Sequence, residues 1–432
     1  MPSSNRRTRR NSVLLLTLLL AGVAKTEASP QATPDHASTH PPEQHQAHAP
    51  DASLSTPWTV AWDGVLFGTF NRQGGSRGET EFRSQNWLMA TAARPLGAGS
   101  LGLTGMMSME PLTAPGRGYS EIFQVGEAYQ GLQITDHQHP HDLFMQLSAS
   151  WSVPLGARSR VTFAGAPVGE PALGPVAFMH RASSAENPLA PLAHHIFDST
   201  HIANSVVLGR FDLGIGAVEG SVFHGREPDE HHYDLHLGAP DSWAARVWLR
   251  PTPGWLIQAS HGFLEEPEEL EPGDQHRTNV SASWSRHRAS GFTAMTAAFG
   301  NNERQFSRVR SFLIEATHKF GPSSIFGRYE ATEVETEILL FPQIVHVPHP
   351  GELVDLVHAL TVGGVRDLAT IRGAAIGVGG DVTFYGVPPL LQNTHDDHPV
   401  SFQVFFRVAR ADPARRMWDM TMAEHGGGHR HR

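Results

Sequence analysis

Three histidines alternate along the segment DHQHPHD, residues 136–142. They are His137, His139 and His141, and in an extended chain alternate side chains share one face. Asp136 and Asp142 flank them, so that imidazole and carboxylate donors would stand together. These donors suit Zn²⁺ or Cu²⁺, with the carboxylates as further ligands or as partners of the rings. The segment therefore predicts a metal site, and the alternative is a polar loop that binds nothing specifically.

A second set of metal donors lies in the long stretch 167–201. Its candidate side chains are Met179, His180, Glu186, His194, His195, Asp198 and His201. A connection of this length in a β-barrel often folds inward as a constriction, which would bring it to DHQHPHD at the mouth or in the lumen. The alternative is a mobile extracellular loop. The predicted metal-binding residues, for copper or zinc, are Asp136, His137, His139, His141, Asp142, His180, His194, His195 and His201.

Further histidines gather in EPDEHHYDLH (227–236), in THDDHP (394–399) and at His346 and His349. The C-terminal residues add Met417, Met420, Met422, His425, His429 and His431. Thioethers beside imidazoles favour the soft ions Cu⁺ and Ag⁺ as well as Cu²⁺. In a flexible Gly- and His-rich tail, this binding would be modest and without fixed geometry.

The elements that must hold these residues are strands, because apolar and polar residues alternate with period 2 from residue 57 onward. The pattern predicts an all-β transmembrane antiparallel barrel of about 16 strands, with 14 to 18 allowed. Short joints alternate with longer polar connections, and tryptophans lie near the strand ends, as in outer-membrane barrels. The predicted strands are 57–70, 80–93, 99–109, 142–153, 158–166, 202–213, 214–226, 241–251, 255–265, 276–288, 290–303, 308–320, 323–336, 352–367, 371–386 and 398–410. The tryptophans expected in the girdles are Trp58, Trp62, Trp87, Trp151, Trp243, Trp255 and Trp284.

The alternation also assigns faces within each strand. In 142–153, the lipid face should hold Leu143, Met145, Leu147, Ala149, Trp151 and Val153, and serines should face the lumen. Candidate lumen charges are Arg246, Arg250, Arg310, Arg328 and Arg407, opposed by Asp63, Glu315, Glu330 and Asp381. Opposed charges of this kind line open porins. They would equally serve as buried ion pairs that close a plugged barrel.

The N-terminus carries export features. A basic start and an apolar run from Val13 to Ala24 predict a signal peptide over residues 1–28, cleaved after Ala24 or Ala28. Residues 29–56, rich in Pro and His, are expected to be disordered, with the barrel over 57–410 and a tail over 411–432. An even strand number would place both termini in the periplasm. There is no cysteine, which excludes thiolate sites, and the net charge of −10 argues against a nucleic-acid partner.

A signal peptide, a His-rich leader and a Cys-free barrel together resemble the copper-resistance outer-membrane protein B family. The resemblance implies heavy-metal handling. We therefore expect a porin-like channel or an envelope protein for copper or zinc binding, transport or resistance. The alternative is a barrel-embedded hydrolase or metal-dependent enzyme that uses the His and Asp loop clusters. The expected partners are outer-membrane lipid, the assembly machinery of that membrane, metal ions or small solutes, and a homotrimer of the chain itself.

Overall fold

The computed structural model describes residues 57–413, 416–418 and 420–424. The predicted signal peptide, the predicted leader and the last histidines of the tail lie outside the described residues. Within the described part, the chain forms one large antiparallel sheet and a small two-stranded sheet.

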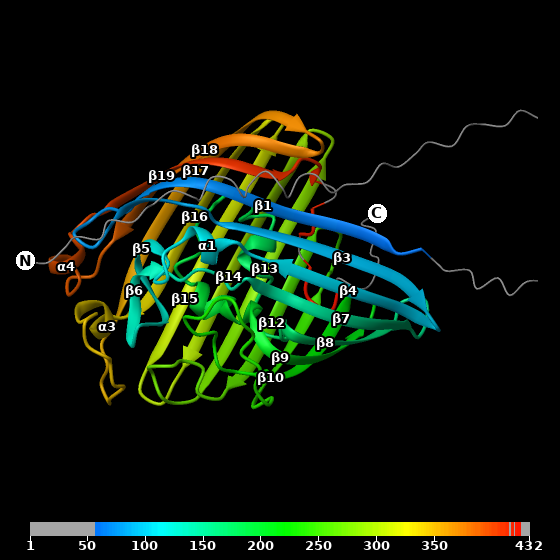
Figure 1. Cartoon of the computed structure of the whole chain (residues 1–432), viewed down its shortest axis with the longest axis horizontal. Helices are drawn as coiled ribbons and strands as arrows, with labels where there is room; N and C mark the ends of the chain where they lie inside the picture. Colours follow the sequence, from blue (N-terminus) through cyan, green and yellow to red (C-terminus); the bar gives the residue numbers. More distant parts are fainter. Residues whose placement is uncertain (1–56, 414–415, 419, 425–432) are drawn as a thin grey trace, which may run out of the picture. The chain divides into compact units, whose positions relative to one another are not determined.

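The large sheet is closed into a barrel, since its first strand pairs with both its last strand and its third (Figure 1). Short β2 and long β3 both pair with β1 and act as one interrupted strand, so the described residues form a barrel of sixteen strands. All sixteen strands predicted from the alternation are confirmed. They are β1 (Thr59–Arg72), β2 with β3 (Thr80–Arg83, Asn86–Leu96), β4 (Gly99–Met107), β7 (Phe144–Pro154), β8 (Arg160–Gly169), β9 (Ala203–Asp212), β10 (Gly216–His224), β11 (Ser242–Leu249), β12 (Trp255–Leu264), β13 (Gln275–Arg288), β14 (Gly291–Glu303), β15 (Arg308–Phe320), β16 (Ser323–Glu335), β17 (Val354–Ile371), β18 (Ala374–Gly386) and β19 (Val400–Arg410).

The connections alternate between tight turns and longer segments, as predicted. One turn is displaced: the predicted strands 352–367 and 371–386 place it within 368–370, but β17 continues to Ile371 and the chain reverses at Arg372-Gly373. Both turn residues have positive φ, at 49° and 83°, which is the backbone of a two-residue hairpin turn. The longer segments carry short elements: α1 (Glu110–Thr113), β5 (Tyr119–Tyr129), β6 (Leu132–Gln138), η1 (Phe178–His180), α2 (His194–Phe197), η2 (Ser199–His201), α3 (Thr336–Leu340) and α4 (Gln392–His395).

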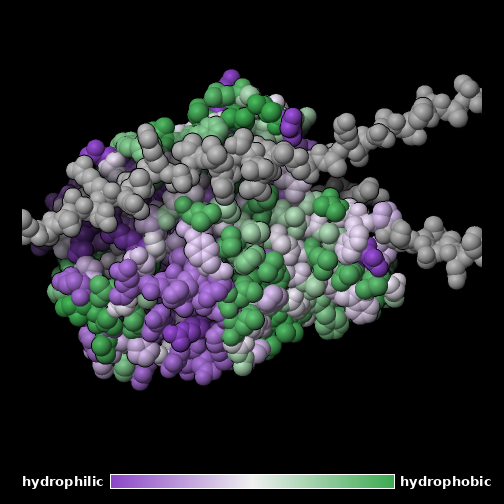
Figure 2. Space-filling view, in the orientation of Figure 1, coloured by the Kyte–Doolittle hydropathy of each residue, from purple (hydrophilic) through white to green (hydrophobic). Residues whose placement is uncertain are grey.

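The outer face of the barrel is apolar. Val280, Phe299 and Leu360 each keep 45–48% of their surface exposed on this face although they are large hydrophobic residues. Figure 2 shows the apolar surface over the wall, with hydrophilic residues gathered toward the end that bears β5, β6 and α3. An apolar belt around a closed antiparallel barrel is the architecture of outer-membrane proteins, so the chain is a porin-like transmembrane β-barrel. No helix among the described residues is long and apolar enough to cross a membrane.

Most predicted girdle tryptophans lie on this outer surface near strand ends. The exposed ones are Trp58, Trp62, Trp151, Trp243 and Trp255. Trp87 was assigned to the girdle wrongly, because it is 7% exposed and packs against His180 with ring centroids 4.8 Å apart. Met145 was also assigned wrongly to the lipid face. The pairing of β7 with β4 shifts register between Met106 and Met107, and Met145 falls at this bulge and is buried.

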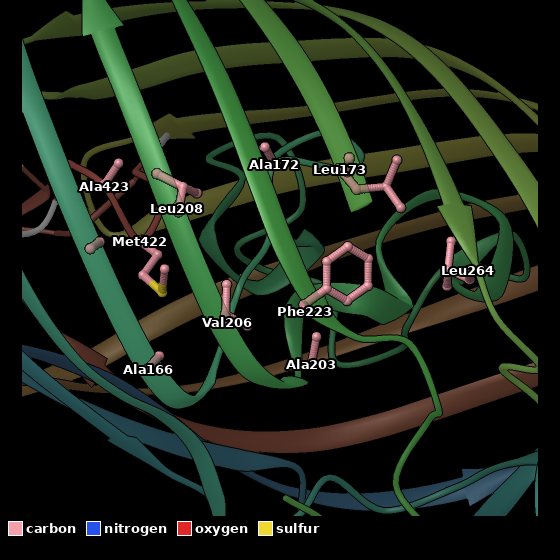
Figure 3. Packing of buried hydrophobic residues seen from close by; sticks show 12 residues of the cluster. Ala166, Ala172, Leu173, Ala203, Val206, Leu208, Phe223, Leu264, Met422 and Ala423 are labelled. Atoms are coloured by element: carbon pink, nitrogen blue, oxygen red, sulfur yellow. The ribbon is translucent and has the colours of Figure 1, made fainter. Parts of the chain in front are cut away.

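The lumen is filled by residues 170–202, which we call the plug loop. Arg181 of this loop contacts Glu315 of β15 at 2.7 Å, and wall residue Arg328 donates to the Leu189 and Ala190 carbonyls. Arg246 of β11 binds Glu170 at 2.9 Å. Figure 3 shows the apolar part of this packing, where Ala172 and Leu173 of the loop lie among Leu208, Phe223 and Leu264 of the wall. The prediction that this long connection folds into the barrel is therefore confirmed, rather than the alternative of a mobile extracellular loop.

The predicted lumen charges mostly face inward, and several of them form buried ion pairs. Arg246 binds Glu219 at 2.8 Å, and Arg328 binds Glu315 at 3.2 Å. Arg310 is the exception, because it shares the outward face of β15 with Phe312 and pairs with Glu333 at the surface. The pairs of Arg246 and Arg328 join neighbouring wall strands, and the same two arginines also hold the plug loop through Glu170 and the Leu189 carbonyl.

The C-terminal segment, whose described residues are 411–413, 416–418 and 420–424, also enters the barrel. Arg416 binds buried Asp63 at 2.8 Å, and Trp418 packs on Phe292 with ring centroids 4.5 Å apart. Glu424 binds Arg250 at 2.6 Å. This described part is packed, and the Gly- and His-rich stretch that was expected to be flexible lies outside the described residues. The apolar residues of the packed part find a partner surface in the lumen that the sequence pattern does not reveal.

Candidate metal centre

Five histidines meet where the plug loop lies against the chain that follows β6. His139 and His141 come directly after that strand, and His194, His195 and His201 come from α2 and η2 of the plug loop. We call these five the histidine cluster. Adjacent rings in it have centroids 5.2 to 6.4 Å apart. Two chain segments about sixty residues apart in sequence therefore build one site.

A partner on the Nδ1 side orients most of these rings. Glu110 contacts Nδ1 of His141 at 3.0 Å, and Glu127 contacts Nδ1 of His139 at 3.1 Å. Asp198 serves two rings: its carboxylate lies 2.7 Å from Nδ1 of His194, and its carbonyl oxygen 2.6 Å from Nδ1 of His201. A ring that donates from Nδ1 keeps its lone pair on Nε2.

The Nε2 atoms of His139, His141 and His201 are buried and have no hydrogen-bond partner among the described residues. Buried polar atoms in proteins normally have a partner, so three such atoms in one cluster call for an explanation. Metal-binding histidines have this arrangement, with one nitrogen held by a carboxylate or carbonyl and the other on the metal. The donor set therefore fits a transition-metal ion.

A small cavity lies between the rings. Its volume is about 10 Å³, and its lining includes His139, His141, His194, His201 and Glu127. Space of this size is at the lower limit for one water molecule. Within the described residues, no three His, Asp or Glu side chains already stand in coordinating geometry. Two imidazoles on one tetrahedral Zn²⁺, with bonds of about 2.0–2.1 Å, have ring centroids about 5.2 Å apart. Neighbouring pairs such as His141 and His201, at 5.4 Å, are close to this spacing. His139 and His141 are 6.4 Å apart, so their rings would have to move about 1 Å closer to share one ion.

The electrostatics of the cluster favour a cation. Burial lowers the pKa of His139, and the neighbouring rings of His195 and His194 lower it further. Burial likewise lowers the pKa of His201. These imidazoles are therefore neutral at pH 7, the form that binds metal. Glu127, Asp142 and Glu227 line the same cavity. Burial raises the pKa of Glu127, and the acidic groups Glu227 and Asp142 raise it further.

The structure brings six of the nine predicted metal-site residues together. Asp142 joins the histidine cluster, because it lines the same cavity as His139, His141, His194 and His201. The other three point elsewhere. Asp136 binds His395 at 2.9 Å, His137 contacts the Thr135 carbonyl at 3.0 Å, and His180 packs on Trp87. The alternation breaks because β6 ends at Gln138, so His137 and His139 do not share one extended face.

Four neighbours of the cluster were not in the predicted set. Glu227 lies 3.8 Å from Nδ1 of His195, and His232 binds Asp142 at 2.9 Å. Both belong to the His-rich segment 227–236, which the composition identified without predicting where it lies in the fold. Glu110 and Glu127 could not be identified from the sequence, because each is a lone carboxylate in a long connection and only the fold brings it to a ring.

The comparisons with known proteins concern the barrel. No protein-family model matches the sequence, and the search of curated proteins gave no match. Solved structures similar to the chain include Pseudomonas putida OprB at high pH, with 10% identity, a TM-score of 0.49, and 83% of this chain and 94% of that one covered. An anion-selective porin from Comamonas acidovorans has 11% identity, a TM-score of 0.48, and 82% and 100% coverage. Salmonella typhi OmpF in complex with daunomycin has 9% identity, a TM-score of 0.48, and 81% and 97% coverage. The barrel itself is established by the closed pairing of this chain's own strands.

Proposed function

We propose that this barrel is a metal-binding protein of the outer membrane that holds Zn²⁺ or Cu²⁺ at the histidine cluster. One observation carries the proposal: five imidazoles converge, and partners on Nδ1 leave buried Nε2 atoms of His139, His141 and His201 without a hydrogen bond among the described residues. Neutral imidazoles with oriented rings are the donors that Zn²⁺ and Cu²⁺ prefer.

The filled lumen supports binding over free diffusion. The plug loop is tied to the wall by Arg181, Arg246 and Arg328, and the C-terminal segment is tied by Arg416. An open porin needs a continuous aqueous path, which these contacts oppose. We propose that transport, if coupled to binding, requires displacement of the plug loop.

We further propose that the long connections face the outside of the cell and that both termini are periplasmic. In outer-membrane barrels the tight turns lie on the periplasmic side, and β1 begins and β19 ends at the side of the tight turns. The metal centre would then lie on the extracellular half and receive ions from outside. The homotrimer stays a prediction.

The test is a Cu²⁺ and Zn²⁺ titration of the folded full chain. We compare the wild type with the variant His139→Ala/His141→Ala/His194→Ala. The matched control is His261→Ala/His276→Ala/His318→Ala, which removes three histidines that lie on the outward faces of β12, β13 and β15. Each triple variant removes the same number of imidazoles, and because those of the control are on the surface, the control also shows how much adventitious binding contributes.

The proposal predicts about one tight equivalent that disappears in the first variant and persists in the control. Cu²⁺ bound at the site should show several equivalent nitrogens in its electron paramagnetic resonance spectrum. Equal titration curves for the wild type and the first variant would show that the cluster is structural, and the metal assignment would be abandoned.

A further inference from the structure

A second group of metal donors lies inside the barrel and is not part of the histidine cluster. One buried cluster of eleven hydrophobic residues contains five methionines, from a chain that has eleven methionines in 432 residues. We call these five, Met89, Met106, Met145, Met179 and Met417, the methionine cluster. Each is at most 7% exposed.

The wall places three of them side by side. Met89 of β3 is directly opposite Met106 of β4 in the strand register. Side chains at opposite positions on one face stand about 4.5–5.5 Å apart at Cβ. Met145 lies at the bulge where β7 pairs with β4, next to Gln146, the partner of Met106. The bulge is what turns Met145 inward, so the local break in alternation adds a third thioether to the row.

The plug loop and the C-terminal segment supply the others. Met179 lies in η1 of the plug loop, and Met417 follows Arg416, whose contact with Asp63 holds the segment against β1. Met420 packs at the edge of the same cluster. Thioethers therefore approach from the wall, from the loop and from the tail, which encloses the group on several sides.

Space for an ion adjoins the cluster. A cavity of about 30 Å³ reaches the cluster at Met179, and its lining includes Phe178, Asn187, His141 and Arg416. This exceeds what one water molecule needs. His141 also lines the cavity of the histidine cluster, so the two sites are neighbours along the plug. The side-chain nitrogen of Asn187 is buried and has no hydrogen-bond partner among the described residues.

We propose that the methionine cluster binds a soft monovalent cation, Cu⁺ or Ag⁺, through thioether sulfurs. Neutral sulfur ligands in an apolar setting select soft ions of low charge, whereas imidazole and carboxylate serve Zn²⁺ and Cu²⁺. The binding step forms metal–sulfur bonds and moves no proton or electron. It is independent of the proposed function, since it uses different atoms and a different class of ion.

Methionine also fills irregular gaps in cores, and a test must separate the two roles. Leu is close to Met in volume, so exchange preserves packing and removes only sulfur. The test variant is Met89→Leu/Met145→Leu/Met179→Leu. The control is Met107→Leu/Met109→Leu/Met295→Leu, which removes three sulfurs outside the cluster, two of them from exposed side chains. Heat-modified gel mobility checks that each variant is folded.

The experiment loads the folded full chain with Ag⁺ in chloride-free buffer and measures X-ray absorption at the silver edge. Because the sequence has no cysteine, any sulfur bound to silver must belong to methionine. The wild type and the control should show a sulfur shell, and the test variant should lose it. The variant His139→Ala/His141→Ala/His194→Ala should retain it, which separates this site from the histidine cluster. Absence of sulfur in the wild type, or equal loss in test variant and control, would overturn the proposal.

Discussion

The contact between Arg181 and the barrel wall gives the sharpest prediction about the plug loop. Arg181 is 2% exposed, and its guanidinium lies 2.7 Å from both Glu315 and Asp198. It also donates to the Val176 carbonyl at 2.9 Å. The change Arg181→Met keeps most of the aliphatic volume and removes the charge, so two buried carboxylates lose a cation.

Removal of one partner from a buried ion pair costs about 3–5 kcal/mol. In the variant Glu315 still pairs with Arg328, and Asp198 still contacts His194. We therefore expect a loss of stability at the low end of this range, about 3 kcal/mol. Each 1.4 kcal/mol changes an equilibrium constant about tenfold. The population with the plug loop displaced should therefore rise roughly 100-fold.

Hydrogen exchange across residues 170–202 measures this displacement directly, and planar-bilayer conductance measures its consequence. The variant should lose about 100-fold protection in the plug loop and gain conductance. Arg310→Met is the matched control, since Arg310 pairs with Glu333 at the surface and its loss should change neither reading. Unchanged protection in Arg181→Met, or an equal change in the control, would refute the role assigned to the ion pair.

Three further predictions concern the wall, the tail and the metal centre. Val280→Arg places a charge on the lipid face at the middle of β13 and should lower the free energy of unfolding in urea by about 2–4 kcal/mol. Ile371→Arg, at the end of β17, should be tolerated. Equal effects of the two changes would contradict the face assignment. Deletion of the chain after Arg410 leaves Asp63 without Arg416. The barrel should then unfold at a lower temperature on gels, and its conductance should rise. A deleted protein that is as stable and as closed as the wild type would refute the packing of the tail. Protonated imidazole does not bind metal, so Zn²⁺ affinity should fall as the pH is lowered. Burial lowers the pKa of His139 and His201, whereas Glu110 raises the pKa of His141 against the effect of burial, so His141 should be the first ligand lost. A Zn²⁺ affinity that does not change with pH would contradict binding by these imidazoles.

The strands could be predicted from the sequence because lipid and lumen impose opposite polarity on successive residues of each strand. One error occurred where the backbone departs from this rule, and the other where a tryptophan faces the filled lumen. Met145 turns inward at a bulge, and Trp87 is buried because the plug loop offers His180 as a packing partner. Neither the bulge nor the partner leaves a local pattern in the sequence.

The candidate site could be predicted in part. Histidine density identified both contributing segments, and His139 and His141 do meet His194 and His201. The Nδ1 partners could not be found in this way, because Glu110 and Glu127 approach through the folded path of residues 108–143. Long-range contacts of single residues depend on tertiary packing, which periodicity does not encode.

The most direct test of the metal centre is a crystal structure of the full chain grown with Zn²⁺, with anomalous scattering measured at the zinc edge. We predict one peak within bonding distance of the Nε2 atoms of His139, His141 and His201, with Glu110 and Glu127 still on the Nδ1 side. Peaks confined to other histidines, such as His346 and His349, with none inside the histidine cluster, would contradict the assignment.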